Sequence, residues 1–207
     1  MDMKGFLSEI EFAVTVSLGA VWKERDRLQE VQAKVAALTP TVDHEYARAE
    51  AIAMNAEDAD DVMLATGVHW DTYFGPDKDL YHRSAEAVEL GELVSVHAFS
   101  CSAQSGSVLQ YAKQGISLVH AGPSACPNGR SIGSQSLKNV IWQGRNQAIH
   151  WEEGKLNSAV KSCFQTLAAE YDPTFADFLS RSLAFEIVGV LEWRDYAAFE
   201  ADMLLLA

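Results

Sequence analysis

The chain has 207 residues and a formal net charge of −13, with 48% hydrophobic and 22% charged residues. This length and composition suit one soluble globular domain with a real hydrophobic core. The acidic balance disfavours a protein that grips a long phosphate backbone, because sequence-independent affinity for nucleic acid comes from lysine and arginine side chains. Any contact with RNA would therefore have to come from a local basic pocket.

The cysteines and the N-terminus predict a cytoplasmic protein without a metal centre or cofactor. Cys101, Cys126 and Cys163 are widely spaced, with no CxxC pair and no His/Cys cluster of zinc spacing. Reduced thiols are the default for such cysteines. Glu9 and Glu11 lie where a signal peptide would need an apolar core. No stretch of 18 residues reads as apolar enough for a membrane span, so we expect no membrane contact.

The N-terminal part of the chain has helical periodicity. Apolar residues follow three- and four-residue steps from Asp2 to Leu38, which predicts one long amphipathic helix or a helix bent near Gly19. Pro40 and Asp43 predict the end of this helix and the cap of the next one. The simplest interpretation of the first helix is a bundle helix with a solvated back.

The second predicted helix, residues 43–66, carries an acidic cluster at Glu57–Asp61. Acidic residues at this spacing could hold a divalent cation. The cluster lacks the glycine turn of an EF-hand loop, and no glutamate in it is followed three residues later by histidine. A solvated acidic face is the better interpretation.

Further along, the turn-forming residues Gly75-Pro76-Asp77 predict a break in the helical pattern, and residues 80–120 predict a third helical stretch. Small and polar residues fill positions 100–107 inside this stretch. They predict either a kink or a place where a second helix approaches closely.

One clear loop, residues 121–135, precedes the next helix. It contains two prolines and three glycines, and Arg130 is its only charged residue. Irregular loops of this length are often functional, and Arg130 together with backbone N–H groups could bind a phosphate of a substrate. Alternatively, the loop only crosses one end of the bundle.

The stretch Leu137–Glu153 predicts a helix with two different faces. Asn146 and His150, four residues apart, share the polar side, and Arg145 lies at its edge. At about 100° per residue, the apolar positions fall on one core-facing stripe. The stripe consists of Leu137, Val140, Ile141, Gly144, Ala148 and Trp151.

The pattern Arg145-Asn146-x-x-x-His150 resembles the signature of the HEPN superfamily, which consists of small all-helical domains. Many of its members are metal-independent endoribonucleases of toxin–antitoxin, antiviral and CRISPR-linked systems. The resemblance rests on about 15 residues around a short motif, together with the helical character of the chain. It implies that Arg145, Asn146 and His150 are catalytic and that the substrate is RNA. A toxin or antiviral-defence role, with an antitoxin or a regulatory protein as a partner, follows from the resemblance alone.

The chemistry of RNA cleavage suits these side chains. The 2′-hydroxyl of RNA can attack its own phosphate if the enzyme supplies a base, an acid and positive charge for the phosphorane. The imidazole of His150 can act as base or acid near neutrality, and the guanidinium of Arg145 can bind phosphate oxygens. Asn146 can orient His150 or donate to the phosphate.

One histidine cannot easily serve as both acid and base on opposite sides of an in-line displacement. Proteins that resemble HEPN nucleases pair two motifs across a homodimer, so we expect a homodimer here. Trp142 and Ile149 lie beside Arg145 on the helical wheel and could form such an interface. Equally, both could belong to the core of a single chain.

Two features oppose the nuclease interpretation. Glu152 occupies the position at which HEPN toxins silenced by nucleotidylation have a tyrosine, so that control is not expected. A salt bridge from Arg145 to Glu152 or Glu153 would make the cluster a surface ion-pair network of little energetic weight. The alternative function is a non-catalytic helical interaction or scaffold module that uses its acidic surface to bind a protein partner.

The remaining sequence predicts one helix at 155–171, a break at 172–174, and further helix from 175 to the C-terminus. No stretch alternates as a β-strand would over any length. The predicted fold class is all-α, an elaborated HEPN-like helical bundle of about five to seven helices. We expect a single domain over residues 1–207. Its parts are long helices at 1–120, the loop at 121–135, and the motif and C-terminal helices at 136–207.

Overall fold

The structure is a computed structural model that describes residues 2–207 and their side chains, except that of Glu24. The predicted all-α fold class is confirmed, because the only sheet in the described chain is a two-stranded hairpin. The chain was expected to be a single domain, and in the structure it divides into two compact units. Unit 1 contains the chain up to Lys23 together with His97–Ala207, and unit 2 contains Glu24–Val96.

The first helix, α1 (Met3–Met54), belongs to unit 1 at its start and to unit 2 for the remainder. It continues through Pro40, so the predicted end of the helix near this residue is wrong. A proline inside a helix removes one hydrogen bond and costs about 3 kcal/mol. Burial beyond the proline offsets this cost, because Val42 and Ala49 pack into unit 2.

Helix α1 is also long and apolar enough to cross a membrane by length and composition. Its most apolar 18-residue window has a mean hydropathy of 1.3, and 39% of that window is buried inside the protein. The expectation that no 18-residue stretch has this character is therefore wrong. Buried helices of proteins outside membranes meet the same criterion, and the start of α1 does contribute Val14, Leu18 and Val21 to the core of unit 1.

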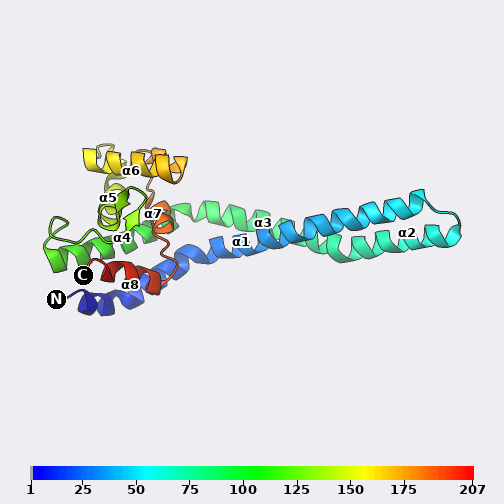
Figure 1. Ribbon diagram of the computed structural model, residues 1–207, viewed down its shortest axis with the longest axis horizontal. Helices are drawn as coiled ribbons and strands as arrows, with labels where there is room; N and C mark the ends of the chain where they lie inside the picture. The colour runs from blue at the N-terminus through cyan, green and yellow to red at the C-terminus, as the bar shows by residue number, and fades with distance from the viewer. Residues whose placement is uncertain (1) are drawn as a thin grey trace. The chain divides into compact units, whose positions relative to one another are not determined.

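Unit 2 consists of the later part of α1, helix α2 (Ala59–Thr72), a π-helical turn η1 (Tyr73–Asp77) and helix α3 (Lys78–Val96). Figure 1 shows α2 and α3 running back along α1. Arg27 Nη2 donates to Glu86 Oε1 at 2.7 Å, and the Tyr46 hydroxyl donates to Asp77 Oδ2 at 2.6 Å. The chain reverses at residues 55–58.

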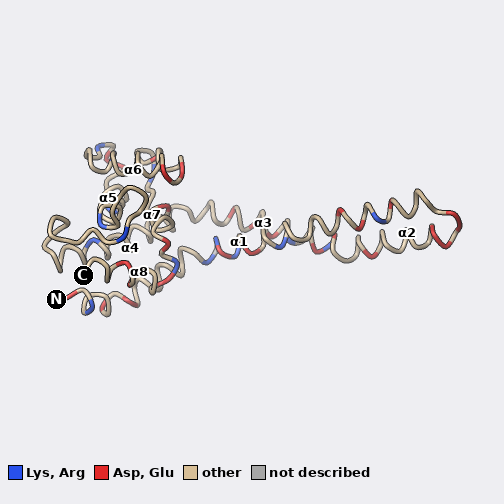
Figure 2. Tube along the Cα trace, viewed as in Figure 1, with Lys and Arg blue, Asp and Glu red and all other residues tan. Residues whose placement is uncertain are grey.

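The predicted break at Gly75-Pro76-Asp77 is confirmed as a kink, because Gly75 has a non-helical backbone with φ −102° and ψ −108° between two helical segments. The acidic cluster Glu57–Asp61 is used for capping. Asp58 accepts from the backbone N–H of Asp60 and of Asp61 at 2.9 and 3.0 Å. Within residues 2–207, no group of three His, Cys, Asp or Glu side chains is placed to hold a metal ion. Figure 2 shows that acidic residues recur along α1 and along the returning helices α2 and α3 in this unit.

Unit 1 holds the main hydrophobic core. After α4 (Ala98–His120) come a short hairpin of β1 (Ser131–Ile132) and β2 (Gln135–Ser136), and then α5 (Leu137–His150). The remaining elements are η2 (Trp151–Glu153), α6 (Ser158–Glu170), η3 (Pro173–Asp177), α7 (Ala184–Val190) and α8 (Tyr196–Leu204). Helix α4 packs against α5 and α7, and α5 also packs against α6 and α7. Helix α5 is therefore central to this unit.

The small residues of α4 do not kink it, because the helix runs unbroken from Ala98 to His120. A Cβ on Gly106 would lie 3.7 Å from that of Ala148, so this part of α4 passes close to α5. The interpretation of residues 100–107 as a place of close helix approach is therefore confirmed at Gly106.

The predicted loop at 121–135 is tied to the core. Ile132 and Cys126 are buried, and the β1–β2 hairpin leads directly into α5. All three cysteines are free thiols, as expected. Burial raises the pKa of Cys163 to about 12, so this thiol is neutral at physiological pH and unreactive.

Candidate functional site

The helix that carries the motif begins and ends by local rules. The Ser136 hydroxyl accepts from the Asn139 backbone N–H at 3.3 Å and caps the start of α5. The α-helix ends at His150, and a 3₁₀ turn, η2, follows before Gly154 at φ 65°. The predicted helix extended to Glu153, so His150 occupies the last turn of the helix and not its middle.

The predicted core stripe is confirmed in its first half. Leu137, Val140, Ile141 and Gly144 are buried, whereas Ala148 is only partly buried. Trp151, the last member of the predicted stripe, is also only partly buried. A Cβ on Gly144 would lie 2.9 Å from Ile187 Cγ2. The glycine is thus needed because α5 and α7 approach so closely at this point.

The buried amide of Gln147 is a further functional contact of α5, and no sequence motif marked it. Its Nε2 donates to the carbonyl oxygens of Phe178 and Arg181 at 2.8 and 2.6 Å, and its Oε1 accepts from Leu183 N at 2.9 Å. These bonds fix the segment between η3 and α7 against α5. The signal lay only in the helical position of Gln147, three residues after Gly144 on the buried side.

Replacing Gln147 by leucine is expected to lower the free energy of unfolding by about 2–4 kcal/mol. The substitution leaves two carbonyls and one N–H buried without partners, and each such group costs about 1–3 kcal/mol, reduced where the segment shifts to reach water. Urea unfolding followed by circular dichroism measures the change. Gln104→Leu, on the exposed side of α4, is the control, and equal stabilities for the two variants would contradict the role given to Gln147.

The guanidinium of Arg145 is partly buried and has only neutral partners. Its Nε donates to Gln110 Oε1 at 2.6 Å, and its Nη1 donates to Asn146 Oδ1 at 3.3 Å. No carboxylate in the described part of the chain pairs with it, so the alternative salt bridges to Glu152 and Glu153 do not form. Burial lowers the pKa of Arg145, although the group stays cationic at any physiological pH.

A second cation stands near Arg145. The ammonium of Lys113 lies 4.7 Å from the centre of the Trp142 ring, in a cation–π contact. Burial and then repulsion from Arg145 lower the pKa of Lys113. Two neighbouring cations thus share one side of the α4–α5 pair, and no ion pair among residues 2–207 neutralises either of them. This is a local basic patch in an acidic protein.

His150 is paired with an acidic residue. Its Nδ1 lies 2.7 Å from Glu153 Oε1, and its side chain is 43% exposed. An ionised carboxylate only accepts hydrogen bonds, so Nδ1 carries the proton and Nε2 is the nitrogen left for a ligand. No contact joins the His150 ring to Arg145 or to Asn146 within the described residues.

Arg130 lies apart from these residues. Its Nε and Nη2 donate to the two carboxylate oxygens of Asp202 at 2.6 and 2.9 Å, and Nη2 also donates to the Leu191 carbonyl at 2.7 Å. Hydrogen bonding to Asp202 raises the pKa of Arg130. The indole N–H of Trp193 completes the cluster by donating to Asp202 at 2.9 Å. Arg130 thus holds the loop against α8. Its positive charge is explained by the ion pair with Asp202, so no substrate phosphate is needed to explain it.

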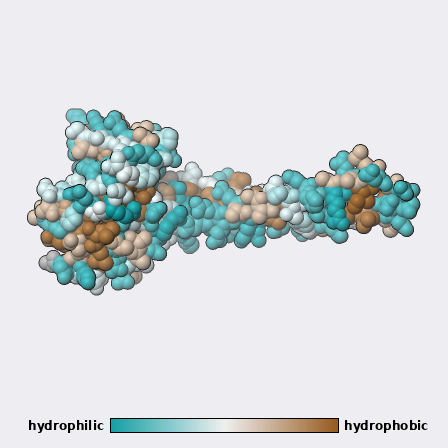
Figure 3. All heavy atoms as spheres, in the orientation of Figure 1, coloured by the Kyte–Doolittle hydropathy of each residue, from teal (hydrophilic) through white to brown (hydrophobic). Residues whose placement is uncertain are grey.

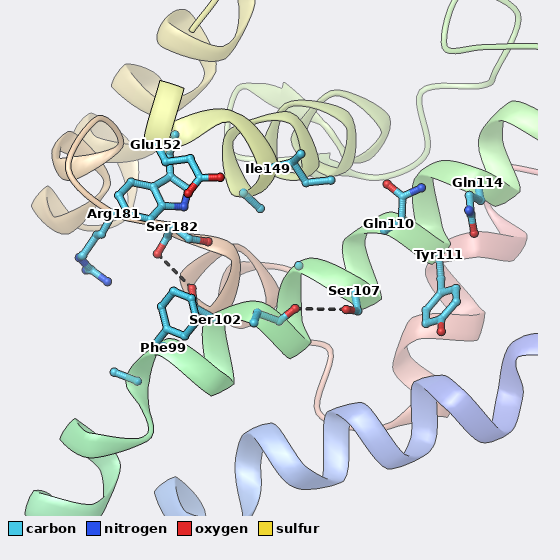
Figure 4. Close-up of a pocket in the computed structure, with 15 residues that line it drawn as sticks. Phe99, Ser102, Ser107, Gln110, Tyr111, Gln114, Ile149, Glu152, Arg181 and Ser182 are labelled. Carbon is cyan, nitrogen blue, oxygen red and sulfur yellow. Dashed lines mark hydrogen bonds between the residues drawn. The ribbon is translucent and has the colours of Figure 1, made fainter. Parts of the chain in front are cut away.

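A groove of about 680 Å³ lies beside the motif in unit 1 (Figure 4). One wall is α4, and the other is formed by the end of α5 with η2 and by the segment that contains Arg181 and Ser182. Ile149, Trp151 and Glu152, which flank His150 in sequence, line this second wall. The α4 wall combines the aromatic side chains of Phe99 and Tyr111 with smaller or polar ones, among them Ser102, Ala103, Gly106, Ser107, Gln110 and Gln114.

Among the predicted site residues, only the sequence neighbours Arg145 and Asn146 are hydrogen-bonded to each other. His150, on the same helix, pairs with Glu153 instead, and Arg130 lies elsewhere, paired with Asp202. Trp142 and Ile149 could belong either to a dimer interface or to the core of a single chain. In the structure, Trp142 is partly buried and Ile149 is 41% exposed. No family model, no curated protein and no solved structure matches the chain. The structure therefore defines an all-α protein in which one helix, α5, carries the partly buried Arg145 and the partly exposed His150.

Proposed function

We propose that the protein is a metal-independent endoribonuclease of the HEPN type, with a site built on Arg145, Asn146 and His150. The observation that carries the proposal is the cationic pair of Arg145 and Lys113, which lacks a carboxylate partner in a chain of net charge −13. Leaving a partly buried guanidinium without a counter-ion is costly, and a phosphate would relieve that cost.

Each motif residue has a role that fits its contacts. Gln110 and Asn146 hold the Arg145 guanidinium so that its remaining N–H groups can bind a phosphate oxygen and stabilise the phosphorane. Glu153 fixes the ring of His150, which leaves Nε2 to take the proton of the 2′-hydroxyl or to protonate the leaving 5′-oxygen. Glu153 is thus a positioning residue, and it replaces the orienting role that the sequence gave to Asn146.

A second copy would complete the site. The cleavage needs both an acid and a base, and one chain presents one such histidine in this region, so a homodimer with two motifs in one cleft supplies both. Ile149, adjacent to His150 and 41% exposed, offers an apolar contact for such an interface. Light scattering should give twice the chain mass, and a strictly monomeric active protein would remove the paired site from the proposal.

The decisive test is cleavage of RNA in excess EDTA by the wild type and by an Arg145→Ala, His150→Ala double variant. We expect cleavage by the wild type only, with products that end in 2′,3′-cyclic phosphates. Cleavage that is equal in the two preparations, absent from both or abolished by EDTA would overturn the proposal. A toxin or antiviral-defence role, with an antitoxin as a partner, would be the next question after a positive result.

The second candidate function is a non-catalytic helical interaction module. Unit 2 favours it, because large apolar side chains on α2, η1 and α3 are exposed (Figure 3), among them Phe74 at 66% and Tyr81 at 72%. Acidic residues accompany them, which suits a basic protein partner. An RNA-inert wild type in the cleavage test would favour this function.

A further inference from the structure

We infer that the outer face of α2 and α3 in unit 2 is a docking surface for a basic helix of a partner protein. Five large side chains on this face, which we call the α2–α3 stripe, are between 49% and 72% exposed: Met63, Trp70, Phe74, Tyr81 and Val88. This docking surface does not depend on the nuclease proposal. It gives the interaction role, the second candidate function, a defined place and a defined occupant.

The stripe takes no part in the packing that closes unit 2. Ala65, Thr72 and Leu90 are the buried side chains of α2 and α3, and they mark the side of these helices that packs inside the unit. Trp70 and Phe74 are each two residues from Thr72 and lie roughly 160° around the helix from it. The two rings therefore point away from the core of the unit.

The centre of the stripe is an ordered aromatic cluster. The rings of Trp70 and Phe74 stack with their centres 5.6 Å apart, and Tyr73 contacts both edge-on at 5.7 and 5.1 Å. These contacts hold the three rings in place and still leave each of them at least 49% exposed. Exposed rings that are already ordered lose little side-chain entropy on binding, and tryptophan and tyrosine often dominate the energy of protein interfaces. Their faces also attract lysine and arginine side chains.

Unit 2 carries most of the negative charge of the protein. Residues 24–96 contain 16 acidic and 6 basic residues, which is −10 of the net charge of −13. Arg27, Arg48 and Arg83 are already paired with carboxylates of the same unit. A nucleic acid, an anionic lipid surface or a second copy of this unit would therefore be repelled, whereas a basic protein would be attracted.

The excess of acidic residues extends to the aromatic cluster itself. Residues 69–82, which include the cluster, contain Asp71, Asp77 and Asp79, and Lys78 is their one lysine or arginine. Asp71 and Asp79 are exposed. A lysine or arginine of the partner can thus contact a ring face and a carboxylate at the same time.

A helix is the occupant that fits the spacing of the stripe. Met63 and Trp70 are seven residues apart, and Phe74, Tyr81 and Val88 follow one another at seven-residue steps. Seven-residue repeats of apolar side chains are the pattern by which one helix packs along another. From the first to the last of these residues the stripe is about 38 Å long at 1.5 Å per residue. An extended peptide would need a sheet edge, and the described elements of unit 2 are all helical.

The test uses a defined peptide as the probe. The peptide has about four heptads, with leucine at positions a and d, lysine at e and g, and a fluorescein label. A second peptide with glutamate in place of every lysine is the control for charge. Binding to the full-length protein is measured by fluorescence anisotropy.

We expect the lysine peptide to bind with a Kd on the order of 10 µM or below and the glutamate peptide to bind at least about tenfold more weakly. Trp70→Ala and Phe74→Ala should each raise the Kd for the lysine peptide at least about tenfold. Both side chains are exposed, so circular dichroism should show that the variants are folded. Phe12→Ala is the matched control, because Phe12 is an exposed aromatic residue of unit 1, and it should leave the Kd unchanged.

Three results would overturn the docking surface. They are equal binding of the lysine and glutamate peptides, no binding of either, and an unchanged Kd in both Trp70→Ala and Phe74→Ala. A wild-type mass of two chains that falls to one chain in Trp70→Ala would also overturn it, because the stripe would then belong to a second copy. The nuclease proposal is tested separately. An RNA-inert wild type leaves the docking surface standing, and cleavage by Trp70→Ala at the wild-type rate is expected if the protein is a nuclease.

Discussion

Replacing Arg130 by methionine is expected to lower the free energy of unfolding by about 3–5 kcal/mol. The Asp202 carboxylate, whose side chain is 7% exposed, would lose both guanidinium hydrogen bonds and remain as a buried charge with only the Trp193 indole as a donor. Methionine fills a similar volume, so the effect reports the lost charge pairing and not a cavity. Urea denaturation of the full-length chain, followed by tryptophan fluorescence, measures this change in the free energy of unfolding.

The matched control is Arg181→Met, because Arg181 forms an ion pair with Glu186 in the same unit but is 45% exposed. Exposed pairs contribute up to about 1 kcal/mol, so this variant should unfold almost like the wild type. Adding Asp202→Leu to Arg130→Met should recover part of the loss, because the buried charge is then removed, although Trp193 loses its acceptor. A change below about 1 kcal/mol in Arg130→Met would show that the cluster does not hold the loop.

The second large effect concerns catalysis and depends on the proposed function. His150→Ala should reduce the rate of RNA cleavage by about 10²–10⁴-fold, the usual contribution of a general acid or base. Because the side chain is 43% exposed at the end of α5, its removal should leave the stability nearly unchanged. Single-turnover cleavage in EDTA measures the rate, and thermal unfolding measures the stability.

Added imidazole should restore part of the activity of His150→Ala, which a purely structural histidine would not allow. His44→Ala is the control, because the side chain of His44 is 75% exposed in unit 2, far from the motif in sequence. Its rate should equal that of the wild type. A full rate in His150→Ala, or a loss without rescue that accompanies unfolding, would remove His150 from the catalytic role.

The sequence by itself determined the features that depend on local chemistry. Three- and four-residue periodicity identified an all-α chain, and the same periodicity identified the buried half of α5 from Leu137 to Gly144. The loop before α5 was recognised from its prolines and glycines. On the predicted polar side of this helix, Arg145, Asn146 and His150 are only partly buried.

Local signals were misleading where packing overrode them. Pro40 has a strong helix-ending tendency, yet burial on the far side keeps α1 continuous. The chain reverses at residues 55–58, inside the stretch 43–66 that was predicted to be one helix, whereas the predicted break at Gly75-Pro76 is present as a kink. No feature of the sequence pointed to the division of the chain into two compact units, and a single domain over residues 1–207 was expected.

Only the tertiary structure decided how the charged and amide side chains are used. Arg130 pairs with Asp202 across 72 residues, and Gln147 binds backbone groups more than 30 residues away. Gln110 meets Arg145 across 35 residues, and the groove beside them exists because two helices and a loop converge. Helical periodicity is set by each residue and its near neighbours, whereas the partner of a charge depends on which distant segments pack together, and no local pattern encodes that.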